Sequence, residues 1–438
     1  MTGSVEARAL ARVRRRLIPF LFVLYVVSYL DRINVGFAAL QMNAALGFSP
    51  AVYGLGAGIF FVSYFLFEIP SNLILARIGA RVWIARIMIS WGLVSVGMML
   101  VSGPRSFLLL RFLLGAAEAG FFPGIILYLT YWFPARERAR AIAQFMTATA
   151  LAGVIGGPLS GALLSMRALG LAGWQWMFLI EGLPAIVLGV VVSRYLTDRP
   201  EQASWLPEDE RAWLSKAMHA EQATRAREHK MSLREALLNP GVWRLSILYF
   251  MIVIGLYGIS FWLPQLVKGF AGLSDLAVGF ISAIPYAVAA LCMVFVAAHS
   301  DRTGERRFHV AAPAFVAAVG FLITATFPSP AVSLLGLSLA AAGIWGAVGP
   351  FWTLPTAFLS GASAAGGIAL INSVGNLGGF LGPYLLGAVK EATGSFSGGM
   401  FVLAMALLFA GLIAVSLHPD QVTLKGPVVR VSGEGMPA

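Results

Sequence analysis

The chain has 438 residues, of which 58% are hydrophobic and 12% charged, and its mean hydropathy is +0.81. A water-soluble domain cannot bury that much apolar surface, so the composition predicts a polytopic membrane protein. The net charge of +11 lies in short segments between apolar runs, which indicates membrane topology rather than nucleic-acid binding. The single cysteine, Cys292, excludes an intramolecular disulfide.

The first apolar run, from Leu17 to Leu40, follows a cluster of arginines. This run has 24 residues, and about 20 residues are enough to cross a bilayer as a helix. The run is too long for the apolar part of a signal peptide, and it lacks a small-residue cleavage site. We therefore expect a retained first membrane span.

Eleven further apolar runs follow, and they predict an all-α protein with twelve transmembrane helices. We place the first six in an N-terminal bundle, residues 1–194, and the last six in a C-terminal bundle, residues 242–418. Residues 195–241 form a polar cytoplasmic linker, in which the sequence from Pro207 to Leu214 predicts the start of a surface helix. The cytoplasmic tail, residues 419–438, is predicted to be disordered. The twelve runs are residues 17–40, 52–75, 83–101, 106–128, 140–164, 174–194, 242–263, 277–298, 309–327, 331–351, 365–388 and 396–417.

Lysine and arginine are unevenly distributed between the loops. If both termini are cytoplasmic, 25 of the 31 basic residues lie in cytoplasmic segments and four lie in outside loops. The remaining two, Arg32 and Arg111, lie within spans. Because basic residues accumulate on the cytoplasmic side of membrane proteins, the sequence predicts that both termini are cytoplasmic.

The two halves of the chain repeat one another at an offset of 225 residues. Three landmarks share this offset, namely Gly79 and Gly304 in loops, the Gly-Pro pairs that begin at Gly157 and Gly382, and the starts of the first and seventh runs at Leu17 and Val242. Internal repeats of this kind are typical of transporters whose halves face a shared cleft. We therefore predict two pseudo-symmetric six-helix bundles.

The loop after the eighth run carries a motif that resembles the signature of the major facilitator superfamily. Its residues are Asp301, Arg302, Gly304, Arg306 and Arg307. In the first copy of the motif, after the second run, Ala76 stands where the aspartate would be. The resemblance implies the major facilitator fold, in which the basic residues of the motif hold cytoplasmic helix ends together. The missing aspartate predicts a weaker latch in the N-terminal half.

Within that superfamily, the chain resembles the anion:cation symporter family, and in particular its bacterial tartrate and sugar-acid uptake members. The resemblance rests on the segments Tyr29–Arg32, Glu68–Asn72, Arg111–Gly120 and Tyr131–Pro134. It implies that Arg32 holds the carboxylate of the substrate. It also implies that Asp31 and Glu118 carry protons and that Arg111 tunes Glu118.

The residues themselves support a charged site inside the N-terminal bundle. Asp31, Arg32, Arg111 and Glu118 lie within the first and fourth runs, where each charge costs roughly 2.5–3.5 kcal/mol. The four residues lie at overlapping depths in the membrane, so the two helices can present one polar cluster to a central cavity. The spans of the C-terminal half carry no interior charge. Arginine suits a carboxylate because its planar guanidinium donates two parallel hydrogen bonds. The alternative is that the four charges form two structural ion pairs without a role in binding.

A hydroxylated anion also needs neutral hydrogen-bonding partners. The candidates are Tyr29 in the first run, Tyr257 in the seventh, and Asn372 and Asn376 in the eleventh. The two asparagines are four residues apart and therefore share one helix face. Alternatively, the asparagines join helices to one another and the aromatic residues only pack. We assign Glu68, near the cytoplasmic end of the second run, to structure or to an inner gate rather than to binding.

These patterns predict a proton-coupled importer of a small organic anion, such as tartrate or another hydroxy or sugar acid. It would work by alternating access in a bacterial inner membrane, and coupling to Na⁺ in place of protons stays open. The first alternative is an antiporter that exports organic anions or drugs, and a Gly-Pro pattern around Gly157 favours it weakly. A membrane sensor is a more distant alternative.

The sequence contains no Ser/His/Asp, zinc or phosphate-loop constellation. We therefore expect neither an enzyme nor a cofactor. We expect a monomer in the lipid bilayer whose partners are the organic anion and protons, with no nucleic acid.

Overall fold

The structure is a computed structural model that describes residues 4–227, 233–270, 272–358 and 364–417. Within these ranges it contains helices and no strand. The disorder predicted for residues 419–438 lies outside the described part of the chain. The α-helices are α1 (Val5–Leu46), α2 (Pro50–Ile78), α3 (Ala80–Gly97), α4 (Pro104–Glu118), α5 (Phe121–Trp132), α6 (Ala135–Met146), α7 (Ala148–Leu164), α8 (Gly173–Tyr195), α9 (Glu208–Arg227), α10 (Leu233–Leu238), α11 (Pro240–Lys268), α12 (Asp275–Thr303), α13 (Arg307–Thr326), α14 (Pro330–Phe358), α15 (Ala364–Asn376), α16 (Gly378–Thr393) and α17 (Ser397–Ser416).

Eleven segments of the described chain are long and apolar enough to cross a membrane. Helices α15 and α16, with only Leu377 between them, together provide the remaining crossing. The prediction of an all-α protein with twelve transmembrane segments is therefore confirmed. The helices extend beyond the apolar runs, since α1 begins at Val5 rather than at Leu17. The predicted surface helix is α9, which begins at Glu208.

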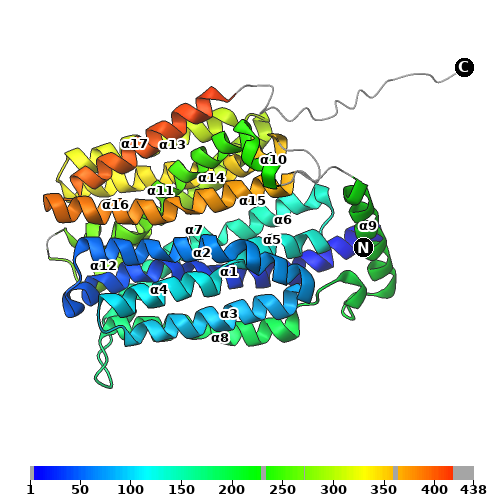
Figure 1. Ribbon diagram of the computed structural model, residues 1–438, viewed down its shortest axis with the longest axis horizontal. Coiled ribbons are helices and arrows are strands. Elements are labelled where there is room, and N and C mark those ends of the chain that lie inside the picture. The colour runs from blue at the N-terminus through cyan, green and yellow to red at the C-terminus, as the bar shows by residue number, and fades with distance from the viewer. Residues whose placement is uncertain (1–3, 228–232, 271, 359–363, 418–438) are drawn as a thin grey trace, which may run out of the picture.

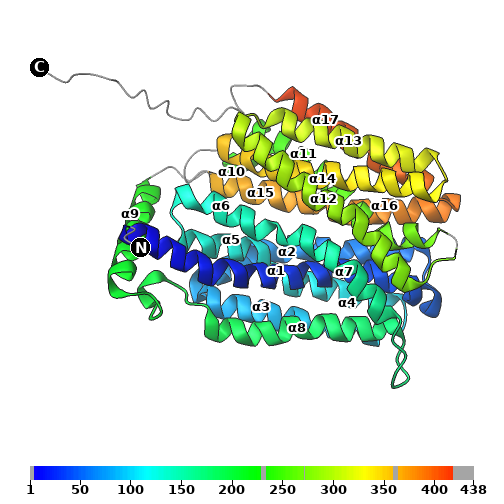
Figure 2. The ribbon, with the colours of Figure 1, turned by 180° about the vertical axis from the view of Figure 1, so that it is seen from behind.

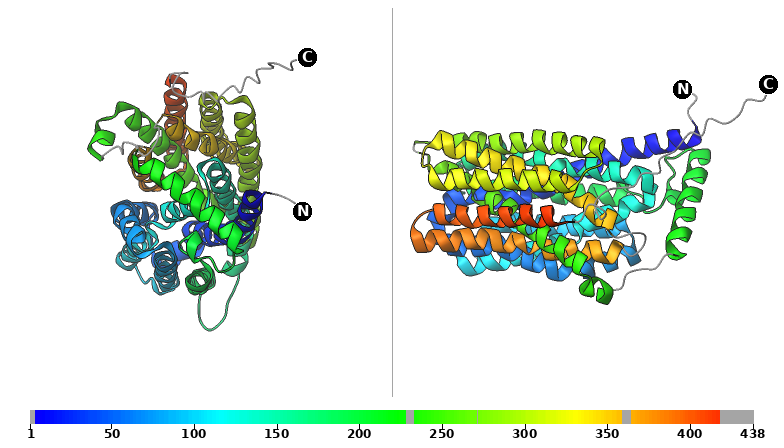
Figure 3. Two further views of the ribbon diagram at one scale, coloured as in Figure 1. Left: turned by 90° about the vertical axis from the view of Figure 1, so that its right-hand side faces the viewer. Right: turned by 90° about the horizontal axis from the view of Figure 1, so that it is seen from above.

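The transmembrane helices run along the long axis of the molecule in two groups (Figure 1). Helices α1 to α8 form the N-terminal group and α11 to α17 the C-terminal group, and the view from behind shows the same division (Figure 2). Helix α9 lies across one end of the molecule (Figure 3). Ion pairs of 2.9 Å between Arg12 and Glu210 and of 2.6 Å between Arg138 and Glu221 hold α9 against α1 and α6. We call the end that carries α9 the inner face and the opposite end the outer face.

Small residues set the ends of several helices on the outer face. Ser49 and Ser274 are the N-caps of α2 and α12, and their hydroxyl groups accept hydrogen bonds from the amides of Val52 at 3.3 Å and Ala277 at 3.2 Å. Such caps satisfy amide groups that have no partner inside the helix. Gly47 ends α1 with a φ of 65°, a left-handed conformation that suits glycine. These residues fix where each crossing begins or ends.

Three predicted spans are broken helices rather than continuous ones. The fourth span consists of α4 and α5, and its break follows directly after Glu118. Gly120 at this break has a φ of 87°, and a Cβ there would lie 2.3 Å from the hydroxyl oxygen of Ser71, so the break needs glycine. The fifth span breaks at Thr147 and the eleventh at Leu377. Broken helices are typical of the midplane binding sites of transporters, and the apolar pattern did not predict them.

Glycines bring the two helix groups into main-chain contact near the outer face. A Cβ on Gly157 of α7 would lie 2.3 Å from the carbonyl oxygen of Gly279 of α12. A Cβ on Gly54 of α2 would lie 2.6 Å from the carbonyl oxygen of Pro383 of α16. Neither contact leaves room for a methyl group, so the helices approach as closely as their backbones allow. The two groups are therefore closed against each other on the outer side.

Candidate functional site

A small cavity lies between the two helix groups, on the inner side of Arg32. Its volume is about 50 Å³, and one water needs roughly 10–15 Å³, so the cavity has room for a few water molecules. The predicted binding residues Arg32, Asn372 and Asn376 share its wall. The lining residues are Tyr25 and Arg32 of α1, Phe61 and Tyr64 of α2, Phe122 of α5, Met146 of α6, Tyr249 of α11, and Asn372 and Asn376 of α15.

Arg32 carries the positive charge of the cavity wall, and 6% of its surface is exposed. Its Nη2 forms a hydrogen-bonded ion pair with Glu118 of α4, and its Nη1 donates to the hydroxyl group of Tyr257 at 3.1 Å. Its Nε has no hydrogen-bond partner among the described residues. The rings of Phe60 and Tyr64 lie 5.4 and 5.6 Å from its Cζ, within the range of cation–π attraction. One donor of the guanidinium, Nε, therefore has no acceptor in the described structure.

Glu118 is the last residue of α4 and is 1% exposed. Besides its ion pair with Arg32, it accepts a hydrogen bond from the hydroxyl group of Ser28 at 2.9 Å. The structure thus brings Arg32 and Glu118 together, as the overlap of the first and fourth spans in depth predicts. Ser28 was not predicted as a member of this cluster.

Asp31 points away from the cavity. Its Oδ2 accepts a hydrogen bond from Trp91 Nε1 at 2.7 Å, and its Oδ1 accepts from Ser95 Oγ at 2.9 Å and from Asn34 Nδ2 at 3.4 Å. Trp91 and Ser95 belong to α3, so Asp31 faces the interior of the N-terminal group. Successive side chains on a helix point about 100° apart, which is why Asp31 and Arg32 diverge. A proton carried by Asp31 therefore does not reach it directly from the cavity wall.

Arg111 binds main-chain oxygens and has no ion pair in the described part of the chain. Its Nε donates to the carbonyl oxygen of Gly56 at 3.1 Å and its Nη2 to that of Ala57 at 3.0 Å, both on α2. The ring of Phe60 lies near both arginines, 5.1 Å from the Cζ of Arg111 and 5.4 Å from the Cζ of Arg32. Any effect of Arg111 on Glu118 is therefore electrostatic and acts without contact. The four charges of the first and fourth spans form one ion pair, not two.

Asn372 contacts an acid across the boundary between the helix groups. Its Nδ2 donates to Glu68 Oε1 at 2.5 Å, and the hydroxyl group of Ser373 donates to Glu68 Oε2 at 3.4 Å. Glu68 belongs to α2 and is 4% exposed. Since α2 runs toward the inner face, Glu68 lies on the inner side of the cavity residue Tyr64. The carboxyl group of Glu68 therefore joins the two groups where an inner gate would lie, while Asn376 keeps its place on the cavity wall.

Tyr29 does not line the cavity in this structure. It is 3% exposed, and its hydroxyl group has no hydrogen-bond partner among the described residues. The substrate contact of Tyr29 stays a prediction, whereas Tyr257 reaches the site through its hydrogen bond with Arg32.

Glu181 is a buried acid that was not predicted as a site residue. It belongs to α8, is 5% exposed and accepts a hydrogen bond from Ser160 Oγ at 2.8 Å. It lies in the middle of the sixth apolar run, so the rule that selected Glu118 also selects Glu181. The buried charges of the N-terminal bundle are therefore not limited to the first and fourth spans.

The predicted conformational motif closes the turn between α12 and α13. Gly304 ends α12 with a φ of 69°, and Arg306 Nη1 donates to Asp301 Oδ1 at 2.6 Å. Arg302 is in the last turn of α12 and Arg307 is the first residue of α13. The ion pair therefore fixes the geometry of the turn on the inner face.

The N-terminal copy of this motif obtains its acid from another segment. Asp198, which follows α8, accepts a hydrogen bond from the backbone amide of Arg81 at 2.8 Å. The same carboxyl group lies against Gly79, where a Cβ would be 2.8 Å from Asp198 Oδ1. Asp198 thus supplies, from a distant position in the sequence, the carboxyl group that is missing at Ala76. The prediction of a weaker latch in the N-terminal half did not take this second acid into account.

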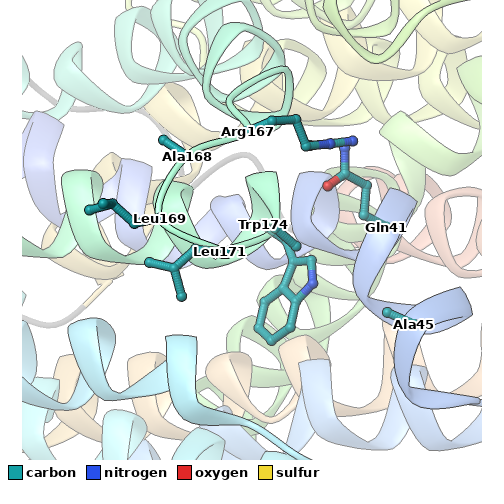
Figure 4. A pocket seen from close by; sticks show the side chains of 9 residues that line it. Gln41, Ala45, Arg167, Ala168, Leu169, Leu171 and Trp174 are labelled. Carbon is teal, nitrogen blue, oxygen red and sulfur yellow. The ribbon is translucent and has the colours of Figure 1, made fainter.

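A larger pocket, of about 670 Å³, lies at the outer face. Figure 4 shows Gln41 and Arg167 approaching each other beside it, with Trp174 below the loop that joins α7 to α8. It shares no residue with the cavity at Arg32, so we do not assign it to the same site. No group of three or more His, Cys, Asp or Glu residues in the described ranges could hold a metal ion.

Comparisons with known proteins agree with this architecture. The model of the family described as Major Facilitator Superfamily matches residues 21–383. A protein of Agrobacterium vitis whose name assigns it provisionally to tartrate transport is 54% identical over 418 residues, which cover 95% of this chain and 96% of that protein. The quinolone resistance transporter of Acinetobacter baumannii is 42% identical over 409 residues, which cover 93% and 94% of the two chains.

The fold also matches a solved structure. A bacterial homologue of the human lysosomal transporter Spinster, in an inward-facing and occupied conformation, has a TM-score of 0.74 at 18% identity, over 92% of this chain and 96% of that chain. The matched family model, the relatives and the fold all describe transporters and not enzymes. The chain is therefore an integral membrane transporter and belongs to the major facilitator superfamily.

Proposed function

We propose that the chain is a proton-coupled symporter that imports a small organic anion, such as tartrate or another hydroxy or sugar acid. The observation that carries the proposal is the position of Arg32, which lines a cavity between the two helix groups and whose Nε has no hydrogen-bond partner among the described residues. The name of the relative from Agrobacterium vitis supports an organic anion as the substrate. The resemblance to the anion:cation symporter family supports the same class.

A carboxylate in the cavity would bind Arg32 through two parallel hydrogen bonds. Asn376 offers an amide on the same wall to a hydroxyl group of the anion. Asn372 becomes available as well when it releases Glu68. A cavity of about 50 Å³ must widen to hold such an anion, so opening at Glu68 would accompany binding or release.

Coupling to protons follows from competition for Arg32. The guanidinium is paired with Glu118 in this structure. When an anion takes over that guanidinium, Glu118 loses its cationic partner in a buried position, where an unpaired carboxylate is strongly unfavourable. Glu118 then binds a proton. Anion binding and proton binding would therefore favour each other, because such coupling is reciprocal.

We also propose how the protein sits in the membrane. The inner face would lie in the cytoplasm of a bacterial inner membrane, as the basic loops predict. Residues 1–194 and 242–418 would act as two bundles that rock around the site in a monomer, joined by the cytoplasmic linker 195–241. The glycine contacts close the outer side, and the bond between Glu68 and Asn372 forms a thinner inner gate.

Transport by purified protein in liposomes would test the proposal. With a pH-sensitive dye inside the vesicles, addition of external tartrate or a sugar acid should acidify the lumen, and an inward proton gradient should concentrate the labelled anion. Thermal-shift screening with dicarboxylates, sugar acids and aromatic acids would select the anion for this assay. Anion uptake that moves no protons would refute symport with protons, and the absence of uptake for every anion that binds would refute import.

Export by antiport is the second candidate, and one observation favours it. The relative from Acinetobacter baumannii, 42% identical, is named a quinolone resistance transporter. In the same liposomes an antiporter would move protons out of the lumen as substrate enters. The direction of the dye signal therefore separates the two functions.

A further inference from the structure

The connection between α7 and α8 is a short hairpin with an apolar tip. It comprises residues 165–172, and Ala168 and Leu171 form an isolated β-bridge within it. At the tip, Leu169 has a φ of 54° and is 86% exposed. A left-handed backbone is unfavourable for leucine, and so is the contact of its side chain with water. An apolar surface outside the chain would remove the second of these costs.

The position of the hairpin indicates which surface this is. The hairpin projects sideways from the N-terminal helix group at its outer end (Figure 1), and the view along the helices shows it beyond their outline (Figure 3). Since the helices cross the membrane along their axes, a sideways projection runs parallel to the membrane. Trp176, whose Nε1 donates to the carbonyl oxygen of Ala168 at 3.1 Å, is of a residue type that membrane interfaces favour. The hairpin therefore lies at the level of the outer lipid headgroups.

The outer pocket of about 670 Å³ lies at the base of this hairpin. Its volume is within the range of roughly 300–1,000 Å³ that is typical of small-molecule sites. Gln41 and Ala45 of α1 line one side of the pocket, and Trp174 of α8 lies below the hairpin (Figure 4). The pocket and the projecting tip therefore belong to one segment of the chain.

Two side chains offer hydrogen-bond donors to this pocket. Arg167 Nη1 donates to the carbonyl oxygens of Leu164 at 3.0 Å and Met166 at 2.9 Å, which orients the exposed guanidinium at the pocket. Trp174 is 4% exposed, and its Nε1 has no hydrogen-bond partner among the described residues. Figure 4 shows this nitrogen on the edge of the indole ring that faces α1. A buried donor without an acceptor costs free energy, which an acceptor in the pocket would recover.

The charges around the pocket favour an anion. Arg167 is the one charged residue that lines it. Gln41 Nε2 donates to Asp275 Oδ2 at 2.7 Å, and Lys268 pairs with the other oxygen of that carboxylate at 2.7 Å. The three ionised side chains therefore carry one net positive charge. The first turn of α8 adds a partial positive charge, which Ala172 at the N-cap position cannot satisfy with its side chain.

We propose that this pocket binds the phosphate group of an anionic phospholipid, such as phosphatidylglycerol, in the leaflet at the outer face. Arg167 and the indole N–H of Trp174 donate to the phosphate, and Leu169 contacts the apolar part of the lipid layer. A soluble anion could use the same donors, but it would not contact the projecting tip. Gln41 joins α1 to α12 through Asp275, so the bound lipid lies beside the closed outer side of the protein. The site shares no residue with the cavity at Arg32 and does not rest on the proposed function.

Native mass spectrometry of the full chain in detergent, titrated with phosphatidylglycerol or phosphatidylcholine, tests the proposal. One phosphatidylglycerol should bind more tightly than phosphatidylcholine. Arg167→Gln should weaken its binding by about tenfold or more. Trp174→Phe, which removes the N–H and keeps an aromatic ring, should weaken it several-fold and keeps the test available if Arg167→Gln does not fold. Arg105→Gln, which removes a positive charge at the outer end of α4, should leave it unchanged.

A second arm distinguishes a lipid from a soluble anion. Leu169→Asn removes the apolar tip, and asparagine tolerates the left-handed backbone. This variant should bind phosphatidylglycerol several-fold more weakly, and glycerol phosphate in large excess should not displace the lipid from the native protein. Displacement by glycerol phosphate together with native affinity of Leu169→Asn would assign the pocket to a soluble anion and overturn the lipid site. Native affinity in both Arg167→Gln and Trp174→Phe would overturn the pocket as the place of binding.

Discussion

Arg32 of α1 donates a hydrogen bond to Tyr257 of α11, and the two residues are 225 positions apart, which is the offset of the internal repeat. Residues at equivalent positions of the two halves therefore meet beside the cavity. Gly36 and Phe261 share this offset, and a Cβ on Gly36 would lie 2.9 Å from the Phe261 carbonyl oxygen. Contacts between equivalent residues are expected along a pseudo-twofold axis between repeats. The axis thus passes between α1 and α11, next to the proposed binding residue.

Replacing Arg32 with lysine should weaken anion binding about 10- to 100-fold. A single ammonium group cannot contact Glu118, Tyr257 and both oxygens of a carboxylate in the planar geometry of a guanidinium. Hydrogen bonds to charged groups contribute about 1.5–3 kcal/mol, which corresponds to this range. Titration calorimetry with the transported anion would measure the change. Arg105→Lys, at the outer end of α4, is the matched control. Near-native affinity of Arg32→Lys would argue against direct carboxylate contact.

Replacing Glu118 with glutamine should separate exchange from accumulation. The amide keeps the size of the side chain but cannot gain or lose a proton at this position. We expect anion exchange across liposomes to persist and concentration of the anion against its gradient to be lost. Counterflow and gradient-driven uptake measured on one preparation would show the two effects. If the variant still concentrates the anion, Glu118 is not the coupling group. Glu201→Gln, in the linker, is the control for the loss of an acidic side chain.

Removing the carboxyl group of Glu68 should open the inner side of the cavity. In a Cys292→Ser background, Met146→Cys on the cavity wall provides a single thiol. Glu68→Ala should increase its labelling rate from the inner face several-fold, because Asn372 and Ser373 lose their acceptor. Asn372→Ala should act in the same direction, and the double substitution should add little, since both delete one contact. Unchanged labelling in both single variants would contradict a gate at Glu68.

Adding a methyl group to the outer contact should shift the protein toward opening on the outer side. Gly279→Ala would place a Cβ 2.3 Å from the carbonyl oxygen of Gly157, so α7 and α12 must separate. Ser282, one turn further along α12 and fully buried, is a suitable position for a reporter cysteine. We expect a membrane-impermeant thiol reagent to label Ser282→Cys faster from outside when Gly279→Ala is present. Gly103→Ala, where a Cβ meets nothing within 4 Å, should have no effect.

The central charges were predictable because a charge inside a membrane has a high free-energy cost. This cost singles out Arg32 and Glu118 as functional candidates, and the pitch of a helix allows Asp31 to face a different direction from Arg32. The identity of its neighbours, Trp91 and Ser95, depends on how α3 packs, which no local pattern contains. Glu181 could have been identified by the same rule, since it interrupts an apolar run.

The sequence pattern could not predict the helix breaks, nor that Asp198 supplies the acid that the first copy of the motif lacks. The break at Gly120 depends on the close approach of Ser71 from α2, a contact between separate spans. Asp198 replaces the missing acid near Ala76 from more than a hundred positions away. Both features arise from tertiary packing, whereas the number of the crossings follows from hydropathy.

The break directly after Glu118 has an electrostatic consequence. The final carbonyl groups of a helix have no partners within it, and they give its C-terminal end a partial negative charge of roughly half an elementary charge. Glu118 occupies that end of α4. The main chain of α4 thus repels an ionised carboxylate at this position, and in this structure the guanidinium of Arg32 offsets the repulsion. Once that cation is drawn away, the partial negative charge of the α4 end remains beside the carboxyl group, whereas an unbroken helix would place no helix end there.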